Sequence, residues 1–330
     1  MRILVTGADG LLGSNVVRML VEEKHQVVAF VHHIRHAHQT LVGVVMERVL
    51  GDLLIEKDVV EAAKGCDVII HIAASTSVWP SRSEIVNKVN IDGTKNVIEA
   101  CKKNNIKRLI CVGSASSFGF GSKENPGVET NPYESGKYGV DYMDSKYKAM
   151  QIVLEEAKKG LPAIVVCPTF MFGAYDSIPS SGAMIVAVYK GSVPALSSGG
   201  KNYIFVKDVA RGIVNALTMG RIGEAYILGH ENLSYKDAFN KIANTIGVKA
   251  PKIMAPDFFI KFVGKMGEVW AGISGKKPTL SYPLACIACE NHYFSAAKAI
   301  KELQLPQTPI EVGIKEAFDW LKNNGYLDKK

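Results

Sequence analysis

Short apolar runs alternate with helical patterns along the first half of the chain. The apolar runs are four to six residues long and rich in valine and isoleucine, which predicts buried strands. They are Ile3–Thr6, Val27–Val31, Val45–Leu50, Val68–His71, Leu109–Val112 and Ile164–Cys167. Helical spacing of apolar residues is found in Leu12–Glu23, Glu56–Ala63, Ile85–Asn104 and Tyr138–Lys159. This alternation predicts an α/β fold with a doubly wound parallel sheet, whose ligand crevice lies at the carboxyl ends of the strands.

The pattern becomes less regular after Pro168, where connections contain more glycine and serine. We expect a dinucleotide-binding domain over residues 1–169, with later return segments such as 203–228. Residues 170–330 are expected to form mostly a smaller substrate-binding lobe. Within them, Ala255–Ile273 is rich in Phe, Met, Val and Trp, with lysines between them. It is too charged for a membrane span, so we expect a helix that packs on the core of the lobe or lines an apolar pocket.

The first predicted strand leads directly into a glycine-rich turn. It reads Thr6-Gly7-Ala8-Asp9-Gly10-Leu11-Leu12-Gly13. Gly7 allows the tight turn, Gly10 allows the backbone to approach an anion, and Gly13 allows the helix to pack closely on the strand. The free N–H groups and positive end of that helix would face phosphates. We therefore expect a Rossmann-type dinucleotide site here, in preference to ordinary turn glycines.

One tyrosine and lysine pair combines a four-residue spacing with a place in a long predicted helix, which suits proton transfer. Tyr142 and Lys146 are four residues apart, so on a helix they share a face. A phenol ordinarily titrates at about pH 10, and a neighbouring ammonium lowers that pKa toward the range useful for acid and base catalysis. The same spacing recurs in a predicted loop, in a predicted strand and at the chain end: Tyr133/Lys137, Tyr203/Lys207 and Tyr326/Lys330.

A hydroxyl should complete this group at the end of the fifth predicted strand. Ser114 is the first choice and Ser116 the second, because both follow Leu109–Val112 at the expected crevice. Such a hydroxyl can donate a hydrogen bond to a carbonyl oxygen as charge develops on it. For either serine, the alternative is a residue that only caps the turn after the strand.

Motifs in a family-specific order extend over nearly the whole chain. They are the Thr6 to Gly13 turn, Gly51-Asp52-Leu53, His71-Ile72-Ala73-Ala74, Asn90 to Asn96, Ser114 to Ser117, Tyr142-x-x-Ser145-Lys146, Cys167-Pro168-Thr169-Phe170 and Phe205 to Ala210. This order resembles extended short-chain dehydrogenases/reductases of the NAD(P)-dependent epimerase/dehydratase group. Within that group, the chain is most similar to the dihydroflavonol-reductase-like and 3β-hydroxysteroid-dehydrogenase-like branch.

The resemblance implies a role for each matching position. The implied catalytic set is Ser114, Tyr142 and Lys146. The implied contacts to the cofactor phosphates are the turn residues Thr6, Gly7, Gly10, Leu11, Leu12 and Gly13. Asp52 and Leu53 would contact the adenine, and Ala73 and Ala74 would lie along the adenosine and diphosphate. Lys146 and Tyr142 would contact the nicotinamide ribose, Pro168 and Phe170 the nicotinamide amide, and Asn90 and Val112 would lie near the site. Alternatives are a helix cap for Asp52, a turn former for Asn90 and, as the preferred interpretation, a satisfied core histidine for His71.

The segment after the second predicted strand bears on cofactor choice. NAD-selective enzymes hold the ribose 2′-hydroxyl with an acidic residue near this point, whereas NADP enzymes need positive groups. Residues 32–38 contain no carboxylate, and His32, His33 and Arg35 are available. We therefore expect NADP, with NAD as the alternative. No metal site is expected, because this histidine-rich loop has no carboxylate or cysteine ligand.

These features predict an NADP(H)-dependent reductase or dehydrogenase acting on the carbonyl or alcohol of a small, hydrophobic or aromatic molecule. Many relatives have arginine where Cys167 stands, so a sugar-nucleotide substrate is less favoured. The alternatives are an NAD-dependent sugar-nucleotide epimerase or dehydratase, and a non-catalytic dinucleotide-binding protein. Tyr142 and Lys146 argue against the latter.

Composition narrows the class of partners. The 330 residues are 47% hydrophobic and carry a net charge of +7, but lysines and arginines alternate with acidic residues, so we expect no nucleic-acid binding. No apolar run approaches the roughly 20 residues that span a bilayer, so we expect no membrane span, no membrane among the partners and a cytoplasmic location. The six cysteines are expected to be buried thiols. A homodimer is possible.

Overall fold

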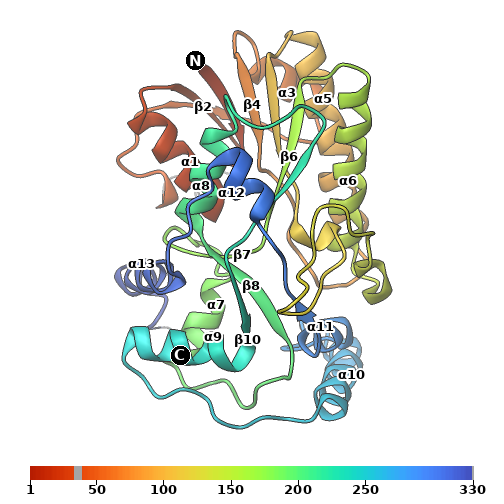
Figure 1. The fold of residues 1–330 in the computed structure, drawn as a ribbon, viewed down its shortest axis with the longest axis vertical. Coiled ribbons are helices and arrows are strands. Elements are labelled where there is room, and N and C mark those ends of the chain that lie inside the picture. Colours follow the sequence, from red (N-terminus) through yellow and green to blue (C-terminus); the bar gives the residue numbers. More distant parts are fainter. Residues whose placement is uncertain (33–38, 329–330) are drawn as a thin grey trace.

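Seven parallel strands form the main sheet of the computed structural model, which describes residues 1–32 and 39–328. In spatial order they are β3 (Glu47–Leu50), β2 (Gln26–Val31), β1 (Arg2–Thr6), β4 (Val68–His71), β5 (Arg108–Val112), β6 (Ala163–Pro168) and β9 (Ala225–Leu228). Every neighbouring pair is parallel. The predicted doubly wound Rossmann-type sheet is confirmed (Figure 1).

Helices cover both faces of this sheet, which explains why its strands are almost continuously apolar. One face packs on α1 (Leu11–Glu22), α8 (Val206–Asn215) and α12 (Ala297–Leu303). The other packs on α3 (Glu56–Ala62), α5 (Gly93–Lys103) and α6 (Asp141–Lys158). Because all strands are parallel, their carboxyl ends and the loops that follow meet at one edge.

A second, smaller sheet lies beyond that edge (Figure 1). Its central strand β8 (Gly200–Phe205) pairs in parallel with β7 (Phe170–Phe172) and β11 (Asn291–His292), and antiparallel with β10 (Glu231–Ser234). The helices α7 (Gly182–Tyr189), α9 (Tyr235–Ile246) and α13 (Ile310–Asn323) share an apolar core with it. The chain reaches this layer after β6 and returns to the main sheet through α8, β9 and α12.

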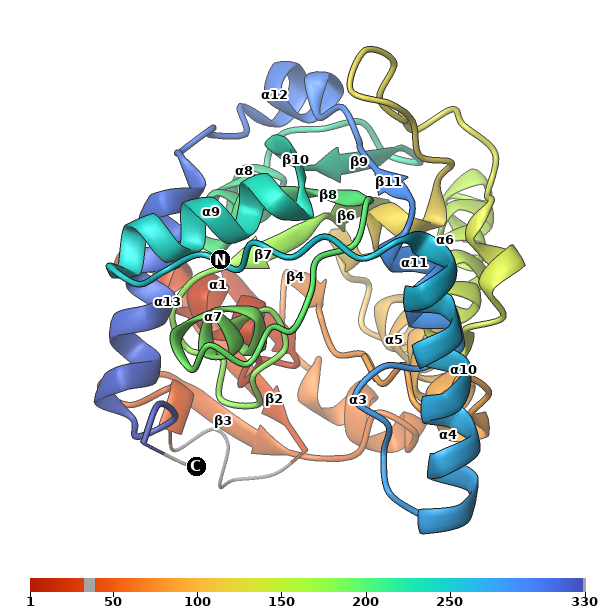
Figure 2. The same ribbon diagram turned by 90° about the horizontal axis from the view of Figure 1, so that it is seen from below.

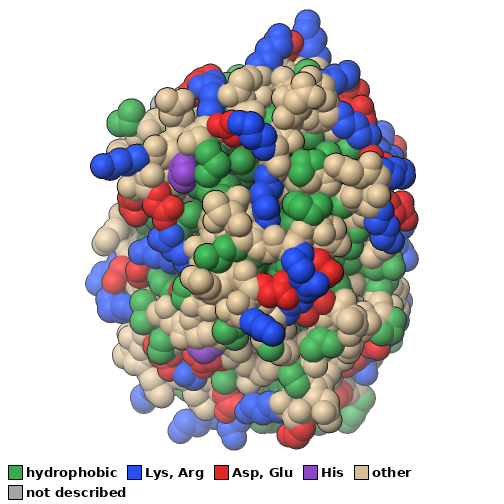
Figure 3. Space-filling view, turned by 45° about the horizontal axis from the view of Figure 1, so that its top comes forward, with side chains coloured by type: hydrophobic (Ala, Val, Ile, Leu, Met, Phe, Trp, Pro, Cys, Tyr) green, Lys and Arg blue, Asp and Glu red, His purple; other side chains and the backbone are tan. Residues whose placement is uncertain are grey.

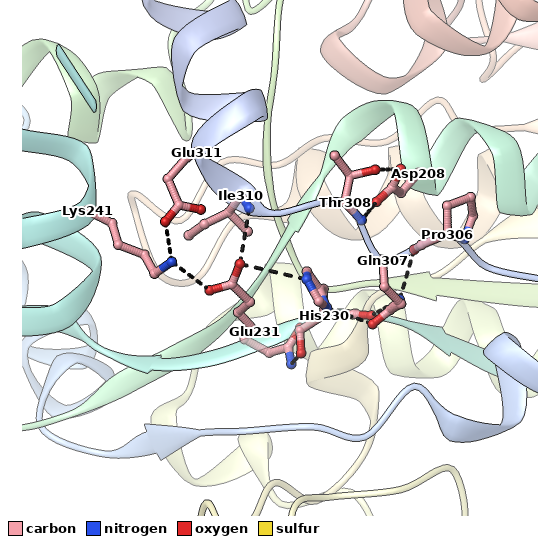
Figure 4. Close-up of polar contacts among 11 residues, drawn as sticks. Asp208, His230, Glu231, Lys241, Pro306, Gln307, Thr308, Ile310 and Glu311 are labelled. Atoms are coloured by element: carbon pink, nitrogen blue, oxygen red, sulfur yellow. Dashed lines mark hydrogen bonds and ion pairs between the residues drawn. The ribbon is translucent and has the colours of Figure 1, made fainter. Parts of the chain in front are cut away.

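A polar network fastens the segment before α13 to both layers (Figure 4). Asp208, in the first turn of α8, accepts hydrogen bonds from the amide (2.7 Å) and hydroxyl (2.9 Å) of Thr308. Glu231 of β10 accepts from the amide of Ile310 at 3.1 Å and forms an ion pair with Lys241 at 3.2 Å. Asp208 therefore ties α8, and Glu231 ties β10, to the segment that leads into α13.

Two predicted helices differ from the structure next to the crevice. The segment predicted as Ile85–Asn104 is divided into α4 (Glu84–Asn87), a π-helical turn (Lys88–Asp92) and α5. The segment predicted as Tyr138–Lys159 begins only at Asp141, because Gly139 adopts a left-handed conformation (φ 63°) after a 3-10 turn (Ser135–Tyr138). Tyr138 therefore does not share the helical face of Tyr142.

Two other expectations concern buried side chains. Ala255–Ile273 is helical, as α10 (Asp257–Ser274), but the expectation that it packs its apolar side on the lobe is wrong: its buried residues are Gly264 and Ala271. Four of the six cysteines are buried, whereas Cys286 and Cys289 are only half-buried in and after α11 (Tyr282–Ala288). Among the described residues, no helix has the length and apolar character to cross a membrane.

Candidate active site

The glycine turn after β1 combines close packing with one open position. A Cβ on Gly13 would lie 2.0 Å from the carbonyl oxygen of Gly7, and a Cβ on Gly7 would lie 2.7 Å from the backbone of Ala73. Gly7 also has φ +66°. A Cβ on Gly10 would meet only the Gly7 oxygen, at 3.6 Å. Gly7 and Gly13 are therefore required by the fold, while Gly10 leaves open space at the start of α1.

The amino end of α1 fits the diphosphate of a dinucleotide. Within the described part of the chain it has no side-chain cap and no acidic residue in its first turn. The first amides of a helix lack intrahelical acceptors and lie at the positive end of its dipole, which suits an anion. Leu12 and Gly13 are buried and Leu11 is half-buried, so these residues present mainly backbone N–H groups.

A chain of hydrogen bonds runs beneath the crevice from β1 to the π-helical turn. The Ala73 amide donates to the Thr6 hydroxyl (3.3 Å), which lies 2.8 Å from Nδ1 of His71. Nε2 of His71 lies 3.1 Å from the Thr94 hydroxyl, which donates to the Asn90 carbonyl (2.7 Å). Since Thr94 uses its proton on Asn90, the network places the His71 proton on Nε2 and makes Nδ1 the acceptor for Thr6. The interpretation of His71 as a satisfied core histidine is confirmed.

Asn90 extends this network to the helix that carries the tyrosine. Its side-chain amide donates to the Ser75 carbonyl (3.0 Å) and to the Ser145 hydroxyl (2.9 Å), and its oxygen accepts from the Ser75 amide (2.7 Å). Ser145 in turn donates to the carbonyl of Tyr142 (3.1 Å). The π-helical turn around Asn90 thus fixes the loop after β4 to the first turn of α6, and π-helical turns often occur at functional sites.

Tyr142, in the first turn of α6, lies beside Ser114, which follows β5. Burial raises the pKa of Tyr142 above the ordinary value of a phenol, and a side-chain hydrogen bond with Ser114 acts in the opposite direction. The Ser114 and Ser116 hydroxyls are 2.8 Å apart, and Ser114 Oγ also accepts from the Ser116 amide. Ser114 is therefore the serine in contact with the phenol, and Ser116 supports it.

Lys146 is buried one helical turn along α6, where its ammonium donates to the Val112 carbonyl at the end of β5 (2.5 Å). Burial lowers the pKa of Lys146. The sequence predicts that this ammonium lowers the pKa of Tyr142, but in this structure the lowering contribution comes from Ser114 instead. The reason is geometric, since the ammonium is directed to Val112.

Buried His71 gives a prediction for stability. Burial, aided by the charge on Lys146, lowers the pKa of His71 from 6.5 to about 3. Between these values the unfolded chain binds one proton more than the folded protein, so the free energy of unfolding should fall as pH decreases from about 6.5 to 3. The slope from this residue is at most about 1.4 kcal/mol per pH unit. Urea unfolding at several pH values should show a weaker dependence in His71→Asn, and an unchanged slope would contradict the assignment.

The predicted adenine contacts lie at the ends of β2 and β3. Asp52 Oδ1 accepts from the Leu54 amide (2.9 Å), and Oδ2 lies 3.9 Å from Nε2 of His32. Leu53 is buried against Gly93 at the start of α5. Asp52 therefore orders its own loop. It does not cap helix α3, because Ile55 occupies the N-cap position of that helix and no side chain caps it. His33 and Arg35 lie outside the described residues.

The remaining predicted contacts border the second sheet. Ala73 and Ala74 follow β4 and are half-buried, and Pro168 ends β6. Phe170 lies in β7, with its ring edge-on to Phe172 and Tyr203. Most of the predicted site residues thus lie at the ends of neighbouring strands or in α6. They are the turn glycines, Ala73, Ser114, Tyr142, Lys146 and Pro168. Phe170 instead belongs to the aromatic cluster of the second layer.

Lys201 and His292 are polar residues beside this cluster that sequence reasoning missed. The Lys201 ammonium lies 4.6 Å from the centre of the Phe170 ring, and no carboxylate of the described segments forms an ion pair with it. Burial lowers its pKa to about 8. His292 pairs with Lys201 in register and contacts Tyr138 through Nε2 at 3.2 Å. Only the paired strands β8 and β11 bring them together, so no local spacing could indicate them.

Residues 1–32 and 39–328 contain no cluster of three or more His, Cys, Asp or Glu side chains suited to a metal ion. On the face shown in Figure 3, Lys and Arg side chains are interspersed with Asp and Glu. The positive net charge is therefore distributed there rather than gathered in one basic patch.

Known proteins share this arrangement over the full length of the chain. A putative dihydroflavonol 4-reductase from Synechocystis sp. is 31% identical over 98% of this chain and 95% of its own. The mouse (Mus musculus) sterol-4-alpha-carboxylate 3-dehydrogenase, decarboxylating, is 27% identical over 90% and 84%. The crystal structure of gox2253 has a TM-score of 0.85 with 32% identity, covering 98% of each chain.

A further structure, of a nucleoside-diphosphate-sugar epimerase from Pseudomonas aeruginosa, has a TM-score of 0.77 with 26% identity, covering 99% of each chain. The model of the family described as "NAD dependent epimerase/dehydratase family" matches residues 3–229, more than half of the chain. The match includes the glycine turn, Asn90, Ser114, Tyr142 and Lys146. The chain therefore belongs to the NAD dependent epimerase/dehydratase family.

Proposed function

We propose that this protein is an NADP(H)-dependent reductase or dehydrogenase that interconverts a carbonyl and an alcohol on a small hydrophobic molecule. The observation that carries the proposal is the contact between the Ser114 hydroxyl and the Tyr142 phenol, one helical turn from Lys146. Relatives named as reductases and dehydrogenases support this reaction class. The glycine turn and the uncapped start of α1 fit the nicotinamide cofactor of the family.

The protein's own residues supply the proton and hold the substrate oxygen. When bound, the nicotinamide supplies hydride to the carbonyl carbon, or accepts it from the alcohol. Tyr142 holds the proton that the substrate oxygen receives, and Ser114 donates a hydrogen bond to the same oxygen. Lys146, whose ammonium is directed to the Val112 carbonyl, would hold the nicotinamide ribose, while the hydrogen bond with Ser114 lowers the pKa of the phenol. The Asn90 to Ser145 contact keeps the first turn of α6 in place.

The second layer is proposed as the substrate lobe, covering most of 170–330. The return to the dinucleotide-binding domain begins at Val206 rather than at the expected Tyr203, because Tyr203–Phe205 belong to β8 of the second layer. Phe170, Tyr138 and Phe120 provide aromatic surface around Lys201 and His292, next to Tyr142. Ligand sites with a mostly aromatic and apolar lining bury an apolar ligand and orient it with a few polar groups. A cyclic ketone with a hydrophobic body fits this composition.

Net cofactor consumption tests the proposed reaction. Purified protein, mixed with NADPH and a panel of hydrophobic cyclic ketones, should show a steady loss of absorbance of the reduced nicotinamide. The product alcohol should form in equal amount. A sugar-nucleotide epimerase or dehydratase returns the hydride, so co-purified NAD with no net NADPH oxidation would contradict the proposal. Tight NADPH binding without turnover of any ketone would instead support a non-catalytic dinucleotide-binding protein.

Cofactor preference is a separate prediction. We expect kcat/KM to be higher with NADPH than with NADH. His32, His33 and Arg35 can bind the 2′-phosphate that NADPH has and NADH lacks, and residues 32–38 contain no carboxylate that would repel it. Arg35→Ser should lower kcat/KM for NADPH by about tenfold, the loss expected for one charge-assisted contact, and leave NADH unchanged. Arg211→Ser, on the outer side of α8, is the control. Equal loss with both cofactors would contradict a role in phosphate binding.

A further inference from the structure

Helix α10 carries an unusual row of exposed apolar side chains. Phe258 is 75% exposed, Trp270 65% and Ile273 76%. The complete set, all at least 41% exposed, is Phe258, Phe259, Phe262, Val263, Met266, Val269, Trp270 and Ile273. We call these eight residues the α10 apolar face. Isolated exposed apolar residues are ordinary, but a contiguous aromatic face of this kind marks an interaction surface.

Small residues on the opposite side attach α10 to the protein. Gly264 and Ala271 are its buried residues. A Cβ on Gly264 would lie 2.7 Å from Cβ of Ala285 in α11, and one on Gly267 would lie 2.5 Å from the Leu280 carbonyl. Since α10 approaches its neighbours through its own backbone, its large side chains are left on the outside. At 3.6 residues per turn, Phe262, Met266 and Ile273 point away from α11.

Lysines border the apolar face. Residues 252–277 contain five lysines and two acidic residues, Asp257 and Glu268. Asp257 accepts a hydrogen bond from Ser198 (2.7 Å), and Glu268 lies 4.0 Å from Lys265. The lysines are Lys252, Lys261, Lys265, Lys276 and Lys277. This surface is therefore apolar in the middle and positive at its borders.

The α10 apolar face lies on the proposed substrate lobe, near Tyr142. Figures 1 and 2 place α10 at the periphery of the molecule, beside α11. Ile287 of α11 packs with Tyr138 and Val140, in the same apolar cluster that contains Tyr142. One short helix thus separates the exposed surface from the proposed proton donor.

We propose that α10 lies in the surface of an anionic phospholipid bilayer, with its apolar face among the acyl chains and its lysines at the headgroups. Amphipathic helices with Trp and Phe on one side and lysines on the border bind bilayer surfaces in this way. Lysines near an anionic surface add an electrostatic attraction to this binding. A symmetric pair of α10 helices would instead bring the lysines of two copies together, which argues against a second copy as the occupant.

Membrane docking would give the active site access to substrates dissolved in lipid. The docking itself rests on α10 alone, whereas this consequence for the substrate rests on the proposed function. The two parts can fail separately, because turnover of a water-soluble ketone does not need a bilayer.

Vesicle co-sedimentation of the full-length protein tests the docking. Wild type should sediment with vesicles of phosphatidylcholine and phosphatidylglycerol at least about tenfold more than with phosphatidylcholine alone, and less in high salt. The double variant Phe262→Asp/Ile273→Asp should lose sedimentation. Ile300→Asp, an exposed isoleucine on α12 that is 43% accessible, is the matched control and should sediment like wild type. Lys261→Glu/Lys265→Glu should lose the preference for phosphatidylglycerol.

Two results would overturn the proposal. One is sedimentation of Phe262→Asp/Ile273→Asp equal to that of wild type. The other is absence of wild-type sedimentation. A wild-type dimer that becomes a monomer in the same variant would then assign the face to a second copy. Unchanged turnover of a water-soluble ketone by the double variant would show that the variant is folded.

Discussion

Replacing Tyr142 with phenylalanine should lower kcat for carbonyl reduction by about 10²- to 10⁴-fold, the usual contribution of a positioned acid or base. The substitution removes only the hydroxyl that would pass its proton to the substrate oxygen. Because the ring remains in place on α6, NADPH binding and the free energy of unfolding should stay close to the wild-type values. The measurements are NADPH oxidation with a hydrophobic ketone, cofactor titration and urea unfolding.

Tyr133→Phe is the matched control for this substitution. Tyr133 also has a lysine four residues later, but its hydroxyl donates to Asp144 (2.6 Å) and its ring stacks on Tyr147. We expect its loss to affect stability and to leave the chemical step unchanged. Similar activity of wild type and Tyr142→Phe, or a large loss of kcat in Tyr133→Phe alone, would show that the wrong tyrosine has been assigned.

Gly13→Ala should destabilise the protein by about 1–3 kcal/mol or more, the range measured for overpacking. The added Cβ would lie 2.0 Å from the Gly7 carbonyl oxygen and 2.9 Å from Cα of Ala8. Both are backbone atoms that cannot rotate away, so α1 must move from β1. Because this movement displaces the amides at the start of α1, NADPH binding should be lost as well.

Gly10→Ala separates these two effects. Its Cβ would meet only the Gly7 oxygen, at an ordinary contact distance of 3.6 Å, so urea unfolding should be nearly unchanged. The methyl group would occupy the open space before α1, so affinity for NADPH should fall. If Gly10→Ala bound NADPH as wild type does, the dinucleotide would not approach α1 at this position.

Local patterns were sufficient for the first six strands of the main sheet and for the catalytic candidates. The apolar runs predicted every strand from β1 to β6, and the ordered motifs predicted the family that the comparisons confirm. The structural roles of Gly7 and Gly13 could be predicted from the motif because they depend on backbone contacts within the turn and with the segment after the neighbouring strand β4. The roles of Ser114, Tyr142 and Lys146 stay predictions that the experiments above test.

Features that depend on distant contacts were not predictable. The π-helical turn interrupts an otherwise regular apolar pattern because Asn90 bonds to Ser75 and Ser145, which lie far apart in sequence. Helix periodicity predicted an apolar side for α10 but not its orientation, which is set by the close approach of Gly264 and Gly267 to their neighbours. The direction of the Lys146 ammonium, toward Val112, likewise depends on the end of β5.

The most direct test of the proposed chemistry is the pH dependence of kcat/KM for alcohol oxidation with NADP⁺. In this direction Tyr142 must be ionised to accept the proton, so the rate should rise with pH to a plateau. In Ser114→Ala, which lacks the hydrogen bond that lowers the pKa of the phenol, the same rise should occur at higher pH. A profile that is unchanged in Ser114→Ala, or that persists in Tyr142→Phe, would contradict the account.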